Sequence, residues 1–176
     1  MTKNELIDAL RWSGERAAKT LASLPALKFA EGRYESGWNG RQILAHMASI
    51  EWTYPRLLEL AKDAPAERPA APASAPSASP QQPLMQAGMA SGSPQILGYN
   101  DRQVAKREGV PIADLIAEFR KNRAATIAAV QAADDALFAK EITSAGGATG
   151  PLADVMNFVA VQHVLGHLRD ITGDAA

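Results

Sequence analysis

Residues 151–173 of the chain read PLADVMNFVAVQHVLGHLRDITG. Apolar side chains recur in it at spacings of three and four, which is the period of an amphipathic helix. Pro151 suits the first turn of a helix, and Gly173 can adopt the left-handed conformation that ends many helices. His163 and His167 are four residues apart, so they share one face of this helix. The stretch therefore predicts a long helix with two histidines on its apolar face.

Three further segments show the same helical period. They run from about residue 2 to 28, from about 39 to 62 and from about 99 to 133. Pro55 lies inside the second segment and removes a backbone donor, so we expect a kink just before it. The third segment has a weak point at 109–111, where a glycine and a proline fall close together.

The fold class follows from these four segments. No segment sustains the alternation of a half-buried strand, and the run 139–142 is too short to change the class. Four amphipathic helices predict an all-α four-helix bundle. With 176 residues, of which 47% are hydrophobic, the whole chain 1–176 is expected to form a single domain.

Residues 63–98 differ in composition and are rich in Ala, Pro and Ser, with seven prolines. Antiparallel neighbours in a bundle usually need only about 2–8 connecting residues. An extended chain of this length could run about 100 Å, whereas a 24-residue helix is about 36 Å long. The segment can therefore cross over along the whole bundle and let helices two and three run parallel. A disordered surface insertion is the alternative.

The composition excludes several classes of function. The formal charge of −1 gives no footprint for nucleic acid or acidic lipid. The absence of cysteine excludes a disulfide scaffold, a Cys-based zinc site and a Cys nucleophile. No P-loop, dinucleotide-binding glycine motif, HExxH or GxSxG occurs. The first residues lack the apolar run of a signal peptide, and no stretch approaches the roughly 20 apolar residues of a membrane span, so we expect a cytoplasmic protein.

The chain has three histidines, and His46, His163 and His167 all fall on apolar helix faces. Buried imidazoles cost free energy unless each finds a partner, and a divalent metal is the simplest partner that three can share. Three protein ligands leave a position open for water or substrate, as in catalytic sites. Zinc or nickel is favoured, and iron also suits imidazole. The alternative is three core histidines, each with its own hydrogen-bond partner.

Other polar residues near the histidines are candidates for supporting roles. Gln42 and Asp170 lie within a turn of a histidine on their helices and are candidate partners of the metal ligands. Tyr54 lies eight residues after His46 and returns to the same face, where it could position a substrate as a catalytic candidate, although core packing is the interpretation we favour. Glu51 should face away from the ligands.

The sequence around these residues resembles that of DinB-like proteins, of which mycothiol-dependent maleylpyruvate isomerases are one type. Residues 37–52, GWNGRQILAHMASIEW, resemble the family segment in which a Trp precedes helix two and a His follows eight residues later. Residues 161–171, VQHVLGHLRDI, resemble the HxxxH of the family's last helix, and 99–109, YNDRQVAKREG, its Asn-containing start of helix three. The resemblance covers most of the chain outside the Ala/Pro/Ser-rich segment.

This resemblance implies an up-down-down-up bundle, in many members a homodimer, with a divalent metal held by His46, His163 and His167. The relatives that the resemblance points to include thiol-dependent transferases and the isomerases, in which a small thiol binds the metal. Other relatives, of the colibactin-resistance type, have a similar fold and act without this metal site.

The expected function combines the metal with an external thiol. A metal with an open position can bind a thiol and lower its pKa, and a chain without cysteine must take that thiol from a low-molecular-weight cosubstrate. We expect an S-transferase or isomerase acting on a small molecule, while a metal-activated water would instead make a hydrolase. The alternatives are a non-catalytic binding or stress protein and a metal-free self-resistance protein. No nucleic acid or membrane partner is expected.

Overall fold

The computed structural model of the chain describes residues 1–32, 37–64 and 94–173, and within these ranges the protein is mostly helical, as the sequence predicts. The α-helices are α1 (Lys3–Ser23), α2 (Ala26–Ala30), α3 (Gly40–Glu51), α4 (Pro55–Asp63), α6 (Pro94–Ala105), α7 (Ile112–Ala132), α8 (Leu152–Met156) and α9 (His163–Thr172). The remaining elements are the 3₁₀ helix η1 (Asp135–Ala139), the π-helical turn η2 (Asn157–Gln162) and the strands β1 (Glu141–Thr143) and β2 (Thr149–Pro151).

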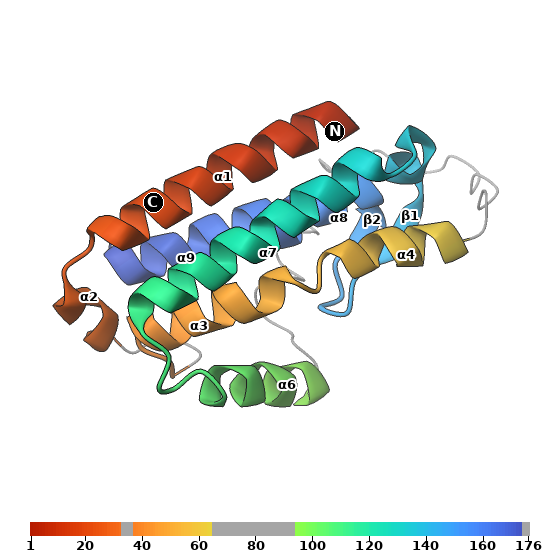
Figure 1. Cartoon of the computed structure of the whole chain (residues 1–176). Helices are drawn as coiled ribbons and strands as arrows, with labels where there is room; N and C mark the ends of the chain where they lie inside the picture. The colour runs from red at the N-terminus through yellow and green to blue at the C-terminus, as the bar shows by residue number, and fades with distance from the viewer. Residues whose placement is uncertain (33–36, 65–93, 174–176) are drawn as a thin grey trace, which may run out of the picture.

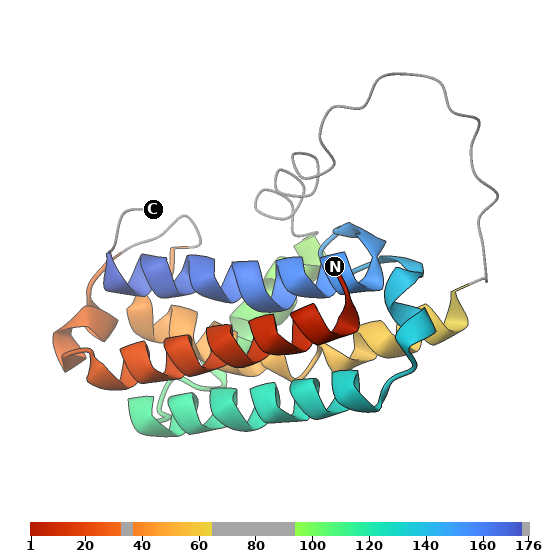
Figure 2. The ribbon, with the colours of Figure 1, turned by 90° about the horizontal axis from the view of Figure 1, so that it is seen from above.

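The long helices lie side by side around a shared core (Figure 1). Helix α7 packs against both α1 and α3, and α9 also packs against both of them. Helix α4 continues beyond α3 along α7, while α6 lies across the outer side of α3 (Figures 1 and 2). Helices α8 and α9 form one long segment through η2, so the histidines of α9 face α3 across the core.

Two groups of buried apolar side chains form the core. One group fills the end of the molecule around α4, η1 and α8 and includes Leu6, Leu152 and Met156. The other fills the opposite end, where α2, α3 and α9 meet, and includes Leu44 and Phe119. The three histidines belong to the second end, because their helical neighbours pack into that second group.

Local sequence signals explain where the helices start and stop. Thr2 caps α1 in a capping box with Glu5, whose Oε2 accepts from the Thr2 backbone at 2.8 Å. Asn39 caps α3 in the same way. Gly40 lets α2 approach α3 closely, since a Cβ there would lie 2.7 Å from the carbonyl oxygen of Lys28.

The predicted kink before Pro55 is a break: α3 ends at Glu51, and α4 begins at Pro55, the first-turn position that proline favours. The predicted third helix is likewise divided at its weak point, and α6 ends before the loop that leads to Ile112. Arg41 holds this loop on α3 by donating to the backbone carbonyls of residues 107, 108 and 110.

The predicted crossover at 63–98 is too long at both ends. Residue 63 still belongs to α4, and residues 94–98 form the first turn of α6. Pro94 is the first residue of that helix, where its missing backbone donor costs nothing, so the last proline of the segment starts a helix instead of preventing one. Residues 65–93 lie outside the described part of the chain.

A small antiparallel hairpin between η1 and α8 was not predicted. Strands β1 and β2 pair with Ile142 opposite Gly150. The turn is closed by Ser144, whose backbone N–H donates to the carbonyl of Ala148 at 2.8 Å, and Gly147 supplies a positive φ of 87°. Strands of three residues are too short to show an alternating pattern, so the sequence did not reveal them.

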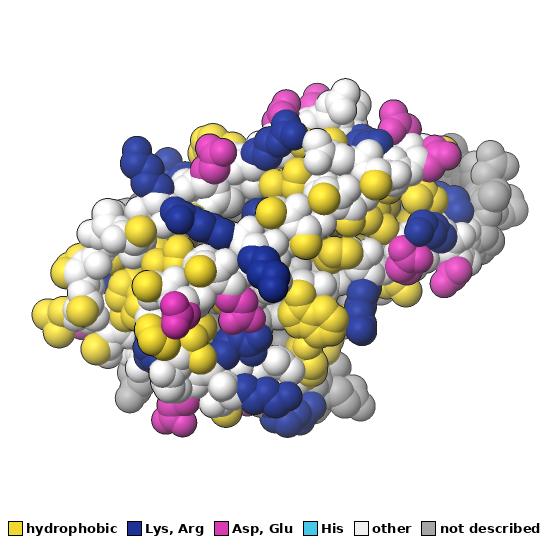
Figure 3. All heavy atoms as spheres, viewed as in Figure 1, with side chains coloured by type: hydrophobic (Ala, Val, Ile, Leu, Met, Phe, Trp, Pro, Cys, Tyr) yellow, Lys and Arg dark blue, Asp and Glu magenta, His cyan; other side chains and the backbone are white. Residues whose placement is uncertain are grey.

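The surface drawn in Figure 3 mixes basic and acidic side chains, in keeping with the balanced charge. None of the three histidines is visible on this face. Among the described helices, none combines the length and the apolar character needed to cross a membrane.

Candidate metal centre

The structure brings together the three histidines that the sequence singled out. His46 comes from the middle of α3, His163 opens α9, and His167 follows one turn later. One nitrogen from each ring lies within 4.8 Å of the other two. The ring centroids are 5.5 Å apart between His46 and His163, 5.1 Å between His46 and His167, and 4.3 Å between His163 and His167.

Two of the ring nitrogens in this cluster have no hydrogen-bond partner in the described part of the chain. His46 is only 3% exposed, and its Nδ1 is buried without a hydrogen-bond partner in the described part of the chain. The Nε2 of His167 is buried and unpartnered in the same way. Since an unsatisfied buried polar atom costs about 1–3 kcal/mol, two such atoms in one cluster of histidines favour a shared partner. Three separately hydrogen-bonded core histidines would not show this arrangement.

The donor set fits a divalent metal. Tetrahedral coordination with metal–nitrogen bonds of about 2.1 Å puts ligand nitrogens about 3.4 Å apart. The separations here, of up to 4.8 Å, therefore need to shorten by up to roughly 1.4 Å. Rotation about histidine side-chain torsions can supply this. Three imidazole ligands suit zinc, nickel, iron or copper better than magnesium or calcium, which prefer oxygen ligands.

Electrostatics keep two of the rings in the form that binds metals. Burial, reinforced by the neighbouring histidines, holds the pKa of His46 well below its usual value. Burial, with a smaller effect of His167, lowers the pKa of His163 to about 3, although a hydrogen bond to the carbonyl of Val159 opposes the shift. Both imidazoles are therefore neutral at pH 7, with a lone pair free to coordinate.

Of the two residues predicted to support the histidines, Asp170 contacts a histidine and Gln42 does not. The Oδ2 of Asp170 lies 3.2 Å from Nδ1 of His167, the geometry expected of a carboxylate that orients a ligating histidine. Gln42 instead completes the capping box of α3, where its Oε1 accepts from the backbone of Asn39 at 2.9 Å. Its position three residues after the helix cap gives it this role.

Trp38 forms part of the surroundings of His46. The two rings are 5.1 Å apart, and the indole N–H of Trp38 donates to Oδ1 of Asp101 on α6 at 3.2 Å. This bond joins the segment before α3 to α6, next to His46. From the sequence, Trp38 drew attention only through the family resemblance, because a single tryptophan before a helix has no specific pattern.

Tyr54 lies among the buried core residues, with 3% of its surface exposed. Its hydroxyl donates to the carbonyl of Val159 at 2.6 Å. Burial raises its pKa far above the usual value, so it stays a protonated donor. This placement agrees with the packing role that we favoured and leaves the hydroxyl engaged with the backbone.

Glu51 is engaged in a buried ion pair that the sequence analysis missed. Its Oε1 lies 2.7 Å from Nε of Arg123 on α7, and its Oε2 accepts from the same guanidinium at 2.9 Å. Burial raises the pKa of Glu51, and Arg123 opposes this shift. The available signal was an arginine on the apolar stripe of α7, since a buried cation requires an anionic partner.

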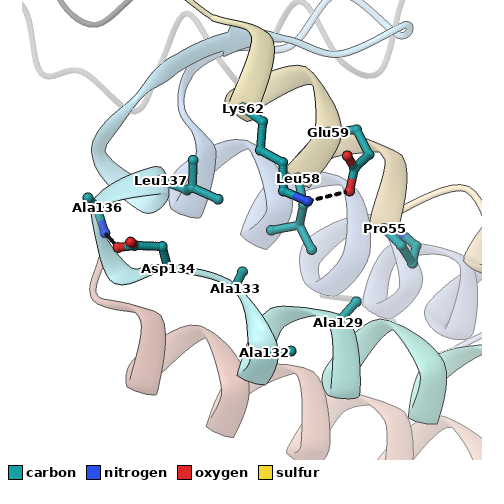
Figure 4. A pocket seen from close by; sticks show the side chains of 10 residues that line it. All are labelled: Pro55, Leu58, Glu59, Lys62, Ala129, Ala132, Ala133, Asp134, Ala136 and Leu137. Carbon is teal, nitrogen blue, oxygen red and sulfur yellow. Dashed lines mark hydrogen bonds and ion pairs between the residues drawn. The ribbon is translucent and has the colours of Figure 1, made fainter.

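A hollow of about 500 Å³ lies away from the histidines, between α4, the end of α7 and η1 (Figure 4). Its walls are mostly alanine and leucine side chains, and Lys62 pairs with Glu59 at its edge. None of the three histidines lines it. The hollow offers no group of converging polar side chains and does not compete with the histidine cluster as the centre of chemistry.

Comparison with known proteins links this geometry to a family. The family model described as the DinB superfamily matches residues 4–171. A crystal structure of the mycothiol-dependent maleylpyruvate isomerase is similar with a TM-score of 0.67 and 17% identity, covering 97% of this chain and 61% of that one. A histidine-to-alanine mutant of that isomerase gives 0.67 and 16%, covering 100% and 62%. At such identity the likeness shows the fold, and the chain spans about three-fifths of those chains. No curated protein matches significantly.

Proposed function

The chain belongs to the DinB superfamily, and from this premise we propose that it is a divalent-metal-dependent enzyme that works with an external low-molecular-weight thiol. His46, His163 and His167 are the ligands. The observation that supports this most directly is the convergence of one ring nitrogen from each histidine within 4.8 Å, in a cluster where His46 and His167 each keep a buried nitrogen without a partner in the described part of the chain. The reaction class is transfer of the thiol to a small electrophilic molecule, or isomerisation of such a molecule through the thiol.

The chemistry requires both components. A divalent cation held by the three histidines would act as a Lewis acid and lower the pKa of a bound thiol toward neutral pH. The chain contains no cysteine, so the thiol has to enter with the substrate. His46 and His163 contribute neutral imidazoles, while Asp170 orients His167. A neighbour in fold is named as a mycothiol-dependent isomerase, which favours a thiol over other cosubstrates.

A hydrolase is less well supported. Metal-activated water usually needs a positioned carboxylate or histidine to accept its proton. The described cluster of candidate ligands contains three histidines and no carboxylate, and Glu51 is bound to Arg123. A metal held by the three histidines would lower the pKa of a bound thiol, and that thiol could then lose its proton to solvent without a protein base. The arrangement therefore favours thiol chemistry.

We also propose the up-down-down-up arrangement of the bundle, with residues 64–93 as the crossover. In Figure 1 the colour order runs one way along α1 and α8–α9 and the opposite way along α3 and α7, which supports this order. A crossover of this type lets α3 lie beside α9, so that His46 on α3 meets the two histidines of α9.

We further propose a homodimer, which sedimentation equilibrium would test.

Metal analysis of tag-free protein is the first test. We expect about one equivalent of divalent metal per chain, or uptake of zinc or nickel after removal of the metal with a chelator. His46→Gln, His163→Gln and His167→Gln should each lose this binding by at least a hundredfold. Gln162→Ala is the matched control, since Gln162 is an exposed neighbour of His163 on the same helical segment. A wild-type chain that binds no divalent metal contradicts the proposal.

A thiol-conjugation screen is the second test. The metal-loaded protein is incubated with low-mass thiols and small electrophiles, and products are followed by mass spectrometry. Turnover that requires both thiol and metal, and that chelation abolishes reversibly, is the expected result. If metal binds tightly and no thiol–electrophile pair reacts, the non-catalytic binding protein is the better description.

A further inference from the structure

The segment before His163 is not a regular α-helix. Residues Asn157–Gln162 form the π-helical turn η2, in which backbone hydrogen bonds reach back five residues. The backbone N–H of His163 accordingly donates to the carbonyl of Phe158. In a regular α-helix that N–H would donate to the carbonyl of Val159. The π-turn thus withdraws the usual donor from Val159, immediately before a candidate ligand.

Side chains from other helices take up the carbonyls of this turn. The hydroxyl of Tyr54, between α3 and α4, donates to the Val159 carbonyl at 2.6 Å. The guanidinium of Arg123, on α7, donates to the next carbonyl, that of Ala160, also at 2.6 Å. Both donors are almost fully buried, so water does not substitute for them. Two adjacent carbonyls of the turn are therefore fixed by two separate helices.

The Val159 carbonyl is also the partner of the His163 ring. The ring of His163 forms a hydrogen bond with this carbonyl, and the same ring brings one nitrogen into the cluster with His46 and His167. An imidazole with a fixed donor nitrogen exists as one tautomer, and its second nitrogen is then always a lone-pair acceptor. Val159 thus connects the Tyr54 hydroxyl to the tautomer of His163.

We propose that Tyr54 is a positioning residue for the histidine site: by holding the Val159 carbonyl of the π-turn, it fixes the ring orientation and tautomer of His163. Tyr54 acts through the backbone and not by touching a substrate, since its hydroxyl is buried and already donates to Val159. The consequence for metal affinity rests on the proposed function, whereas the consequence for the His163 ring does not.

The test uses Tyr54→Phe, which removes the hydroxyl and keeps the packing of the ring. Arg123 is unsuitable, because its loss would leave Glu51 as a buried unpaired charge and could prevent folding. Thr126→Val is the matched control: Thr126 is fully buried, and its hydroxyl donates to a backbone carbonyl at 3.2 Å, but that carbonyl belongs to Glu51. Both variants lose one buried hydroxyl donor.

Two measurements are made on the full chain without a histidine tag. The first is nitrogen-15 NMR of the imidazole rings in metal-free protein, where three histidines give signals that single substitutions assign. We expect one tautomer for His163 in wild type and in Thr126→Val, and a mixture in Tyr54→Phe. The second is zinc affinity by competition with a chromophoric chelator, expected to weaken about tenfold in Tyr54→Phe and less than twofold in Thr126→Val.

The outcomes separate the two proposals. A wild type that binds no zinc contradicts the proposed function, while the NMR comparison still decides the role of Tyr54. If Tyr54→Phe keeps the wild-type tautomer of His163 and the wild-type zinc affinity, the positioning role is wrong. It is equally wrong if Thr126→Val changes both readouts as much, because the effect would then be a general loss of core stability.

Discussion

Asp170 lies beside one of the two ring nitrogens of His167, at 3.2 Å from Nδ1. With Asp170 beside Nδ1, the buried and unpartnered Nε2 is left for the shared centre. Asp170→Asn keeps an oxygen that can accept from Nδ1 but loses the negative charge. We expect the zinc dissociation constant to rise about tenfold, the lower end of the effect of residues that support metal ligands. Competition titration of metal-free protein measures this.

The control for this substitution is Asp154→Asn, earlier in the same helical segment. Asp154 is half-exposed and pairs with the N-terminal amino group at 3.3 Å, away from the histidines. Its loss should leave the zinc affinity within a factor of two. Equal weakening by both substitutions would mean that Asp170 acts only through the overall charge.

The lowered pKa values of His46 and His163 predict how the metal-free protein responds to acid. An unfolded histidine takes up a proton near pH 6.5, whereas folded His163 does so only near pH 3. Between these values the unfolded state binds more protons, so the free energy of unfolding falls as the pH is lowered. Each such histidine contributes a slope of up to about 1.4 kcal/mol per pH unit. His46 acts in the same direction.

Urea unfolding of chelator-treated protein at pH 7, 6 and 5 measures this slope. His163→Gln removes one of the titrating groups, so its stability should depend less steeply on pH than that of wild type. The Gln162→Ala variant should follow the wild type. Identical slopes for His163→Gln and wild type would show that the ring of His163 is not held neutral by burial.

The candidate site could be predicted from sequence because its residues carry their own signal. Histidines are rare in this chain, and an imidazole on an apolar stripe is conspicuous against the helical period. The partners of neighbouring polar residues were harder to assign. Gln42 had two plausible partners within one turn, and the pairing of Glu51 with Arg123 joins positions 72 residues apart, a separation that no local pattern encodes.

Among the elements, α1 carries a glycine where it packs against the Arg123 side chain of α7. Gly14 is buried on α1, and a Cβ there would lie 2.9 Å from Cγ of Arg123. The Arg123 side chain cannot move aside, since its guanidinium is bound to Glu51 and to Oγ of Ser13. Gly14→Ala should therefore destabilise the protein by about 1–3 kcal/mol through overpacking, which outweighs the roughly 1 kcal/mol that alanine gains in a helix.

Gly98→Ala on α6 is the matched control with the opposite sign. The nearest atom to a Cβ there is the flexible end of Arg102, at 3.4 Å. We expect a gain of about 0.5–1 kcal/mol from helix propensity alone. Urea unfolding compares the two variants. A stabilised Gly14→Ala protein would mean that Arg123 has room to shift.

Two kinds of element were not predicted from the sequence: the hairpin strands, which are too short to show a pattern, and the π-turn, whose apolar spacing resembles that of an α-helix. The hairpin strands have three residues each. The π-turn had a faint signal: Met156, Ala160, Val164 and Leu168 are all buried and are spaced strictly by four. In an ideal α-helix each step of four drifts about 40° around the axis, so a constant apolar face over this length requires a wider turn.

At the scale of the whole molecule, the histidine cluster joins helices that are remote in the chain. Helix α3 contributes one histidine and α9 two, and His46 and His163 are 117 positions apart in the sequence. The described core is divided into two apolar groups, and the cluster belongs to the group where α2, α3 and α9 meet. A metal ion bound by all three rings would stabilise that end of the bundle, where two histidine nitrogens are otherwise buried and unpartnered in the described part of the chain.

Metal binding should therefore stabilise the entire fold. A ligand bound only by the folded state adds about 2.7 kcal/mol at a free concentration one hundred times its dissociation constant. For a chain of this size each kcal/mol raises Tm by about 2–4 °C, so saturating zinc should raise Tm by about 5–10 °C over chelator-treated protein. Differential scanning calorimetry measures the shift. His46→Gln, which keeps both histidines of α9, should show a shift below about 2 °C. An equal shift in this variant would mean that the metal is held by α9 alone, and the bridge between α3 and α9 would then be wrong.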